Sequence, residues 1–207
     1  MPRVRWSQVE RESCLPLNID TQKEPLMKAS VYVGTSVDGF IARRDGSVDW
    51  LNEAQGLVPA GEDCGYKAFM DSIDTLVMGR KTFEQVLTFG SWHYGDTPVV
   101  VLSHRVVTIP SHLPDTVSWS SEAPRSLLQR LSGQGVKHVY VDGGSTIQGF
   151  LAESLIDEIT ITSIPMILGS GIPLFGPMEK DLKLIHVSTR AYDFGFVQTT
   201  YRIVKNV

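Results

Sequence analysis

Two segments of this chain lead from an apolar strand through glycine directly into a helix. Residues 75–82 read Thr-Leu-Val-Met-Gly-Arg-Lys-Thr, and residues 137–150 run from Val-Tyr-Val into Asp-Gly-Gly-Ser-Thr and an apolar helical pattern. Glycine lets the backbone approach a ligand closely, and the unpaired N–H groups at a helix start attract anions. Two such units in one domain predict a ligand that carries several phosphates.

The charge of the chain requires such an anion site to be local. The 207 residues are 42% hydrophobic, which suits one sizeable core, and the net charge is −4. This charge gives no overall attraction to nucleic acid or to an anionic membrane, so we expect neither as a partner. Positive charge gathers instead at Arg80, Lys81, His104 and Arg105.

Cysteine usage and hydropathy predict a cytoplasmic protein without a bound metal. The two cysteines, Cys14 and Cys64, are too few for a disulfide framework or a zinc cluster. No apolar run reaches the roughly 20 residues that span a bilayer, and the first residues lack the apolar core of a signal peptide. We expect a soluble protein that is not exported.

The pattern divides the chain into a tail and one domain. Residues 1–26 are polar, contain Pro16 and Pro25 and show no sustained period, which predicts an N-terminal extension prone to disorder. Residues 27–207 form the domain. Strands are expected at residues 29–34, 74–78, 97–102, 116–119 and 138–141, and helices at residues 63–71, 82–89, 123–131 and 145–153.

The alternation of strands and helices stops after the last of these helices. Residues 157–164, 182–187 and 194–204 are strand-like, with no helical pattern between them. Alternating strands and helices predict a parallel sheet, and strands without helices between them predict antiparallel pairing. The expected fold class is therefore α/β, with a mostly parallel central sheet flanked by helices and antiparallel strands at its C-terminal edge.

Two common nucleotide-binding motifs are absent. Gly34 and Gly39 have the glycine spacing of a P-loop, but Phe40 and Ile41 stand where lysine and a hydroxyl residue are required. The segment Gly-Ser-Gly at residues 169–171 lacks the third glycine of the dinucleotide fingerprint and is followed by proline instead of a helix. An ordinary NTPase is thereby excluded, and a Rossmann domain is disfavoured.

Five short segments occur in an order that is typical of one family. They are Thr-Ser-Val-Asp-Gly-Phe-Ile-Ala at residues 35–42, Met-Gly-Arg-Lys-Thr-Phe at 78–83, Val-Val-Leu-Ser at 100–103, Val-Asp-Gly-Gly-Ser at 141–145 and Pro-Met-Ile-Leu-Gly-Ser-Gly-Ile-Pro-Leu-Phe at 165–175. Together they extend over about residues 28–204, and the chain resembles the dihydrofolate reductase-like superfamily. The resemblance is closest to the C-terminal reductase domain of the bacterial riboflavin-biosynthesis deaminase-reductase. It implies an NADPH-dependent oxidoreductase that forms a homodimer.

The same resemblance assigns a cofactor role to fourteen residues. Those after the first strand–glycine unit would hold the adenosine 2′-phosphate, which fits two cations at a helix start. Those after the second unit would clamp the pyrophosphate, and backbone near residue 41 would frame the nicotinamide. The residues are Gly34, Ile41, Ala42, Gly79, Arg80, Lys81, Thr82, Leu102, Ser103, His104, Gly143, Gly144, Ser145 and Thr146.

The resemblance also points to residues on the substrate side. It places a catalytic carboxylate early in the helix before residue 75, where Asp63 stands beside Glu62. Such a carboxylate could protonate a ring nitrogen, although an acidic residue also stabilises a helix start without any catalytic role. Asp38 and Trp50 are further substrate-binding candidates, with a turn aspartate and a packed tryptophan as the alternatives. The loop at residues 169–175 suits packing, a dimer contact or substrate binding equally.

The function that these observations predict is reduction of a small heterocycle by NADPH. The leading substrate is a riboflavin-pathway ribosylaminopyrimidine, as for a 5-amino-6-(5-phosphoribosylamino)uracil reductase, although no deaminase pattern is attached. Dihydrofolate is the enzymatic alternative. A dimer that binds NADPH without catalysis is the alternative of another class.

Overall fold

The computed structural model describes residues 27–205, so the predicted extension, residues 1–26, and Cys14 lie outside the described residues. The strands of the described part are β1 (Lys28–Ser36), β2 (Phe40–Ala42), β3 (Thr75–Gly79), β4 (Val99–Leu102), β5 (Val117–Ser120), β6 (His138–Asp142), β7 (Glu158–Ile164), β8 (Ile172–Pro173), β9 (Leu184–Ala191) and β10 (Val197–Ile203). The helices are α1 (Asp49–Gln55), α2 (Tyr66–Met70), α3 (Arg80–Leu87), α4 (Pro124–Gly133) and α5 (Gly144–Ala152).

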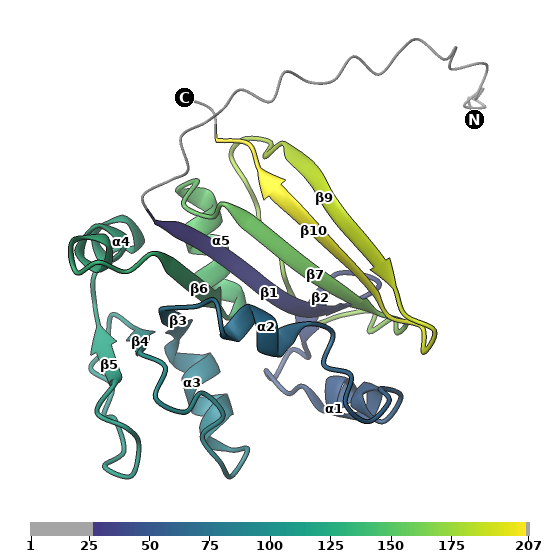
Figure 1. Cartoon of the computed structure of the whole chain (residues 1–207), viewed down its shortest axis with the longest axis horizontal. Helices are drawn as coiled ribbons and strands as arrows, with labels where there is room; N and C mark the ends of the chain where they lie inside the picture. Colours follow the sequence, from purple (N-terminus) through teal and green to yellow (C-terminus); the bar gives the residue numbers. More distant parts are fainter. Residues whose placement is uncertain (1–26, 206–207) are drawn as a thin grey trace.

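One large sheet organises the domain (Figure 1). Its eight strands follow the order β5-β4-β3-β6-β1-β7-β10-β9. Pairing is parallel from β5 through to β7, and β10 then pairs antiparallel with both β7 and β9. The predicted fold class is confirmed, including the antiparallel strands at the C-terminal edge.

Alternation along the strands separates two cores. On β6, Val139 and Val141 face the core shared with α4 and α5, whereas Tyr140 faces a second core that includes Phe83 of α3. Helices α2 and α3 therefore cover the opposite face of the sheet from α4 and α5. Because side chains alternate along a strand, Asp142 lies on the same face as Tyr140.

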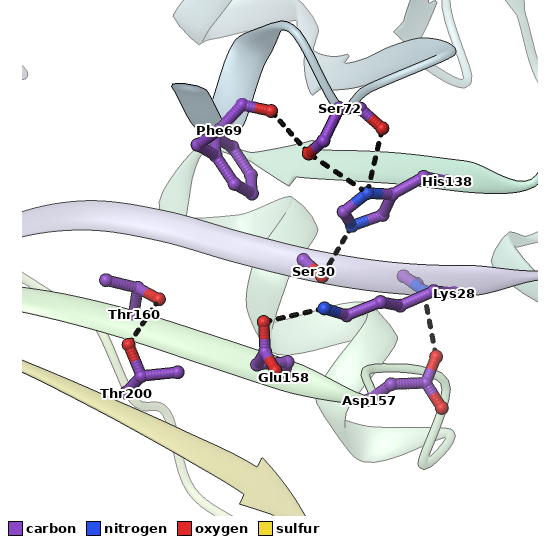
Figure 2. A network of polar contacts seen from close by, with 10 residues as sticks. Lys28, Ser30, Phe69, Ser72, His138, Asp157, Glu158, Thr160 and Thr200 are labelled. Carbon is purple, nitrogen blue, oxygen red and sulfur yellow. Dashed lines mark hydrogen bonds and ion pairs between the residues drawn. The ribbon is translucent and has the colours of Figure 1, made fainter. Parts of the chain in front are cut away.

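A polar network ties the amino ends of the central strands together (Figure 2). The imidazole of His138 donates from Nδ1 to the carbonyl oxygen of Ser72 at 3.0 Å, and its Nε2 lies 2.8 Å from Ser30 Oγ. Lys28 forms an ion pair with Glu158 at 2.7 Å across β1 and β7. These contacts lie at the edge of the sheet opposite to the glycines at the carboxyl ends of β3 and β6.

The structure differs from the sequence-based expectation around residues 49–66. Helix α1 was not predicted; its burial comes from Trp50 and Ala54, which share one helix face at a spacing of four residues. The predicted helix over residues 63–71 is shorter, because Cys64 has a positive φ of 56° and α2 begins only at Tyr66. The expected helical position of Cys64 is therefore wrong.

The loop that contains Gly169 folds back on the turn after β1. Strand β8 pairs antiparallel with β2, with Phe40 opposite Pro173 and Ala42 opposite Ile172. The backbone N–H of Leu174 also donates to the carbonyl oxygen of Gly39 at 3.0 Å. This packing gives the loop a structural role that the sequence left open.

Within residues 27–205, none of the helices combines the length and the apolar character needed to cross a bilayer.

Candidate functional site

The two strand–glycine–helix units lie side by side. Strands β3 and β6 pair in parallel with Met78 opposite Asp142, so Gly79 and Gly143 follow at the same edge of the sheet. A Cβ on Gly79 would lie 2.6 Å from Thr146 Oγ1, and a Cβ on Gly143 would overlap Thr82 Oγ1. Each glycine thus lies against the threonine of the neighbouring helix, and a side chain at either position would separate the two units.

Both helices begin without a side-chain cap. Helix α3 starts at Arg80 and α5 at Gly144, and among residues 27–205 neither helix start has a side-chain cap hydrogen bond. Gly143 precedes α5 with a φ of 89°, which favours glycine. Two adjacent helix starts with uncapped N–H groups are suited to bind an anion such as a pyrophosphate.

The predicted cationic residues surround this edge. Gly79 lies opposite Leu102 on β4, which places Ser103 and His104 beside the start of α3. Arg80 forms an ion pair with Glu84 at 2.5 Å on its own helix, whereas Lys81 is exposed and makes no ion pair within the described residues. Ser103 Oγ accepts the backbone N–H of Arg105 at 3.0 Å, which fixes the turn after β4.

The residues predicted to frame the nicotinamide also reach the second unit. A Cβ on Gly144 would lie 2.8 Å from Ile41 Cδ1, so β2 packs on the start of α5. Ala42 is buried, and Gly34 near the end of β1 lies beneath Leu51 of α1. Ser145 is exposed in the first turn of α5. The structure therefore brings the fourteen predicted cofactor residues to the carboxyl ends of β1, β3, β4 and β6 and the adjoining β2.

Asp38 holds the returning loop. Its carboxylate accepts the hydroxyl of Ser36 at 2.7 Å and the backbone N–H groups of Leu168 at 3.1 Å and Gly169 at 2.7 Å. The hydroxyl of Ser36, with these two N–H groups, lowers the pKa of Asp38, so the carboxylate is ionised at neutral pH. Both oxygens already have partners, and a role in substrate binding stays a prediction.

Asp63 caps the start of α2. Its carboxylate accepts the backbone N–H groups of Gly65 and Lys67, each at 2.8 Å, and its side chain is exposed. The N–H groups of Lys67 and Gly65 lower the pKa of Asp63, which favours the ionised form. The geometry thus gives Asp63 a capping role, and its predicted catalytic role stays a prediction.

Asp142 is a carboxylate that the sequence analysis did not single out. It ends β6 immediately before the glycines, on the same face of the sheet as α2 and α3, and burial raises its pKa to about 6. Its Oδ1 accepts the backbone N–H of Gly143 at 2.8 Å. Alternation of Val139, Tyr140 and Val141 along the strand was the signal that could have found it.

Aromatic side chains lie near Asp142 on that face. Burial raises the pKa of Tyr66 on α2 and of Tyr94 in the loop after α3, and the nearby charge of Asp142 raises both further. Tyr32 on β1 stands beside Tyr66, with ring centroids 5.9 Å apart. A carboxyl group among phenol rings is suited to hold a planar ring and to exchange a proton with it.

Trp50 of α1 lies in a core cluster separate from the one that contains Tyr94 and Tyr140. Its side chain is fully buried among Ile164, Tyr192 and Phe196, and its Nε1 has no hydrogen-bond partner within the part of the chain that the structure describes. The predicted contact between Trp50 and a substrate stays a prediction.

The model of the RibD C-terminal domain family matches residues 29–197. The uncharacterized protein YwjB of Bacillus subtilis (strain 168) is 34% identical over 171 residues, which cover 80% of this chain and 92% of YwjB.

Solved structures share the fold. The putative riboflavin biosynthesis protein from Shewanella sp. PV-4 is 38% identical, with a TM-score of 0.81 over 86% of this chain and 100% of that one. The dihydrofolate reductase from Enterococcus faecalis, complexed with NADP(H), is 16% identical, with a TM-score of 0.57 over 86% of this chain and 97% of that one. The fold is therefore dihydrofolate reductase-like.

Proposed function

Because the chain belongs to the RibD C-terminal domain family, we propose that it is an NADPH-dependent reductase of a small heterocyclic substrate. One observation carries the proposal: two uncapped helix starts lie next to each other, and each follows a glycine at which a Cβ would clash with the neighbouring helix. This edge fits a pyrophosphate, and the cations beside it fit a further phosphate.

Residues of three segments would hold the cofactor. The N–H groups after Gly79 and Gly143 would bind the pyrophosphate, Arg80 and Lys81 the adenosine 2′-phosphate, and Leu102 to His104 would border the adenosine ribose. A doubly charged phosphate gains more than a hydroxyl from two cations, which favours NADPH over NADH. When bound, the cofactor supplies a hydride.

Asp142 is the proton donor in this proposal. Reduction of a carbon–nitrogen double bond places a hydride on carbon and a proton on nitrogen. Burial raises the pKa of Asp142 to about 6, close enough to neutral pH for both protonation states to be accessible. The Asp142 carboxyl would donate its proton to the ring nitrogen or imine nitrogen, while Tyr66 and Tyr94 would orient the ring.

A ribosylaminopyrimidine of the riboflavin pathway is the leading substrate. The similarity to a putative riboflavin biosynthesis protein over 86% of this chain supports it. Dihydrofolate remains the enzymatic alternative, and a non-catalytic NADPH-binding dimer remains the alternative of another class.

The test is an assay of NADPH oxidation, measured as the loss of absorbance of the reduced nicotinamide. Three mixtures each contain the purified protein and NADPH. The first also contains 5-amino-6-(ribosylamino)uracil, the second its 5′-phosphate, and the third dihydrofolate. Turnover with either uracil supports the proposal, and turnover with dihydrofolate alone supports the alternative substrate. Cofactor binding without oxidation in all three mixtures would contradict a reductase of these rings.

We further propose that the chain forms a homodimer through β9. This edge strand exposes Leu184, Ile185 and Val187 by 40–47%. Leu184 also lines an apolar groove with Leu151, Phe175, Met178 and Leu182. An exposed strand edge beside continuous apolar surface favours association with another chain. Light scattering should report a dimer, and Val187→Lys should shift it toward the monomer; a monomeric wild type would contradict this.

A further inference from the structure

The two ends of the candidate site differ in charge. On the cofactor side, residues 79–84 and 102–105 contain three lysines and arginines and one acidic residue, Glu84, which pairs with Arg80. On the substrate side, residues 43–66 contain five acidic residues against two basic ones, and residues 88–97 add Asp96 without a lysine or arginine. The printed sequence thus gives the substrate side an excess of four negative charges over those two segments.

Contacts place these acidic segments around the substrate side. Leu51 of α1 lies over Gly34 near the carboxyl end of β1, where a Cβ would be 3.4 Å from Leu51 Cδ1. Tyr66 of α2 lies beside Tyr32 of β1, with ring centroids 5.9 Å apart, and the charge of Asp142 contributes to the raised pKa of both Tyr66 and Tyr94. The acidic segments therefore border the face on which a ring would lie against Asp142.

Most cations of this region are already engaged by carboxylates. Arg43 pairs with Asp49 at 2.7 Å, and Lys67 pairs with Asp71 at 2.8 Å. Arg190 on β9 pairs with Glu62 at 3.1 Å. Arg44 is exposed and makes no ion pair within residues 27–205. A phosphate on the substrate would thus meet one unengaged arginine among several carboxylates.

From the aromatic surface and the charge around it, we propose that the substrate is a planar nitrogen heterocycle that carries no phosphate or other anionic group. This inference rests on the proposed reductase function and narrows its substrate to the unphosphorylated form. A phosphate carries about −1.5 to −2 charges at pH 7, and repulsion acts over a Debye length of roughly 8 Å at physiological salt. Dihydrofolate, with its glutamate carboxylates, is disfavoured for the same reason.

Isothermal titration of a matched ligand pair tests this proposal. The protein is first saturated with NADP⁺ and then titrated with 5-amino-6-(ribitylamino)uracil or with its 5′-phosphate. The unphosphorylated compound should bind at least tenfold more tightly at low salt. This difference in affinity should shrink as added salt screens the repulsion. Equal affinities, or tighter binding of the phosphate, would overturn the inference.

Charge variants separate local repulsion from the net charge of the protein. Glu53 and Asp96 are exposed on the substrate side. The double variant Glu53→Lys, Asp96→Lys should reduce the difference in affinity between the two uracils at least threefold. Asp115→Lys is the control, because Asp115 is exposed before β5, at the amino edge of the sheet. An equal effect of the control would show that the difference in affinity does not come from these segments and would contradict the inference.

The outcomes also separate this inference from the proposed function. Absence of NADP⁺ and NADPH binding counts against the reductase itself. Binding of NADP⁺ with preference for the phosphate leaves the reductase proposal intact and rejects the uncharged substrate. Binding of NADP⁺ without binding of either uracil rejects this ring class as substrate while the cofactor site stands.

Discussion

Thr82 and Gly143 come from different strand–helix units, yet a single methyl group on Gly143 would overlap the Thr82 hydroxyl. Likewise, a Cβ on Gly79 would lie 2.6 Å from the Thr146 hydroxyl oxygen. This mutual fit sets how closely the starts of α3 and α5 approach each other, and so sets the width of the predicted pyrophosphate site.

Replacement of Gly143 by alanine should therefore reduce both stability and cofactor binding. The φ of 89° is strained for any side chain, at a cost of about 1–3 kcal/mol, and the methyl group must also displace Thr82. Denaturant unfolding and the rise in melting temperature with NADPH measure the two effects. Gly133→Ala is the matched control, because a Cβ there meets nothing within 4 Å; an equally mild effect at Gly143 would contradict the tight fit.

Replacement of Arg80 and Lys81 together by alanine should weaken NADPH binding much more than NADH binding. Each lost charged hydrogen bond to the 2′-phosphate costs about 1.5–3 kcal/mol, and NADH lacks that phosphate. Titration of both cofactors measures the difference. Lys67→Ala, which breaks a similar exposed pair between Lys67 of α2 and Asp71 just after it, should change neither affinity. Equal losses for both cofactors in the double variant would show that these cations do not recognise the 2′-phosphate.

Asp142→Asn should remove most of the turnover and leave NADPH binding intact. If the protonated carboxyl donates the proton, kcat/KM should fall as the pH rises through about 6 in the wild type. The Asn variant should lose this dependence. Asp63→Asn is the comparison: unchanged turnover would remove Asp63 from the mechanism, whereas a large loss at Asp63 and none at Asp142 would exchange their proposed roles.

His138 should make the fold less stable in mild acid. Burial, with a smaller effect of Lys28, lowers the pKa of His138 in the folded protein below the value of about 6.5 expected when unfolded. The unfolded chain thus binds a proton first, so the free energy of unfolding falls as the pH drops below about 6.5. Urea unfolding at several pH values measures this, and His138→Gln should flatten the slope; an unchanged slope would exclude His138 as its source.

Much of the fold could be predicted from local sequence patterns. The strands at β3, β4, β6 and β7, the order of strands and helices, and the two glycine units are encoded in contiguous residues, since strand alternation and glycine punctuation are local properties. Helix α1 was missed because its signal is a single buried pair, Trp50 and Ala54, in a polar segment. The position of Cys64 was missed because carboxylates at residues 62 and 63 bind the backbone there and delay α2.

The sequence alone determined the two strand–glycine–helix units, because glycines and helix starts depend only on neighbouring residues; that an anion binds there stays its prediction. Only the tertiary structure decided which carboxylate has a raised pKa. Asp63 and Asp142 are the same chemical group, but Asp63 is exposed and hydrogen-bonded to a helix start, whereas Asp142 is desolvated beside Tyr66 and Tyr94. Desolvation depends on residues distant in the chain, and only folding brings them together.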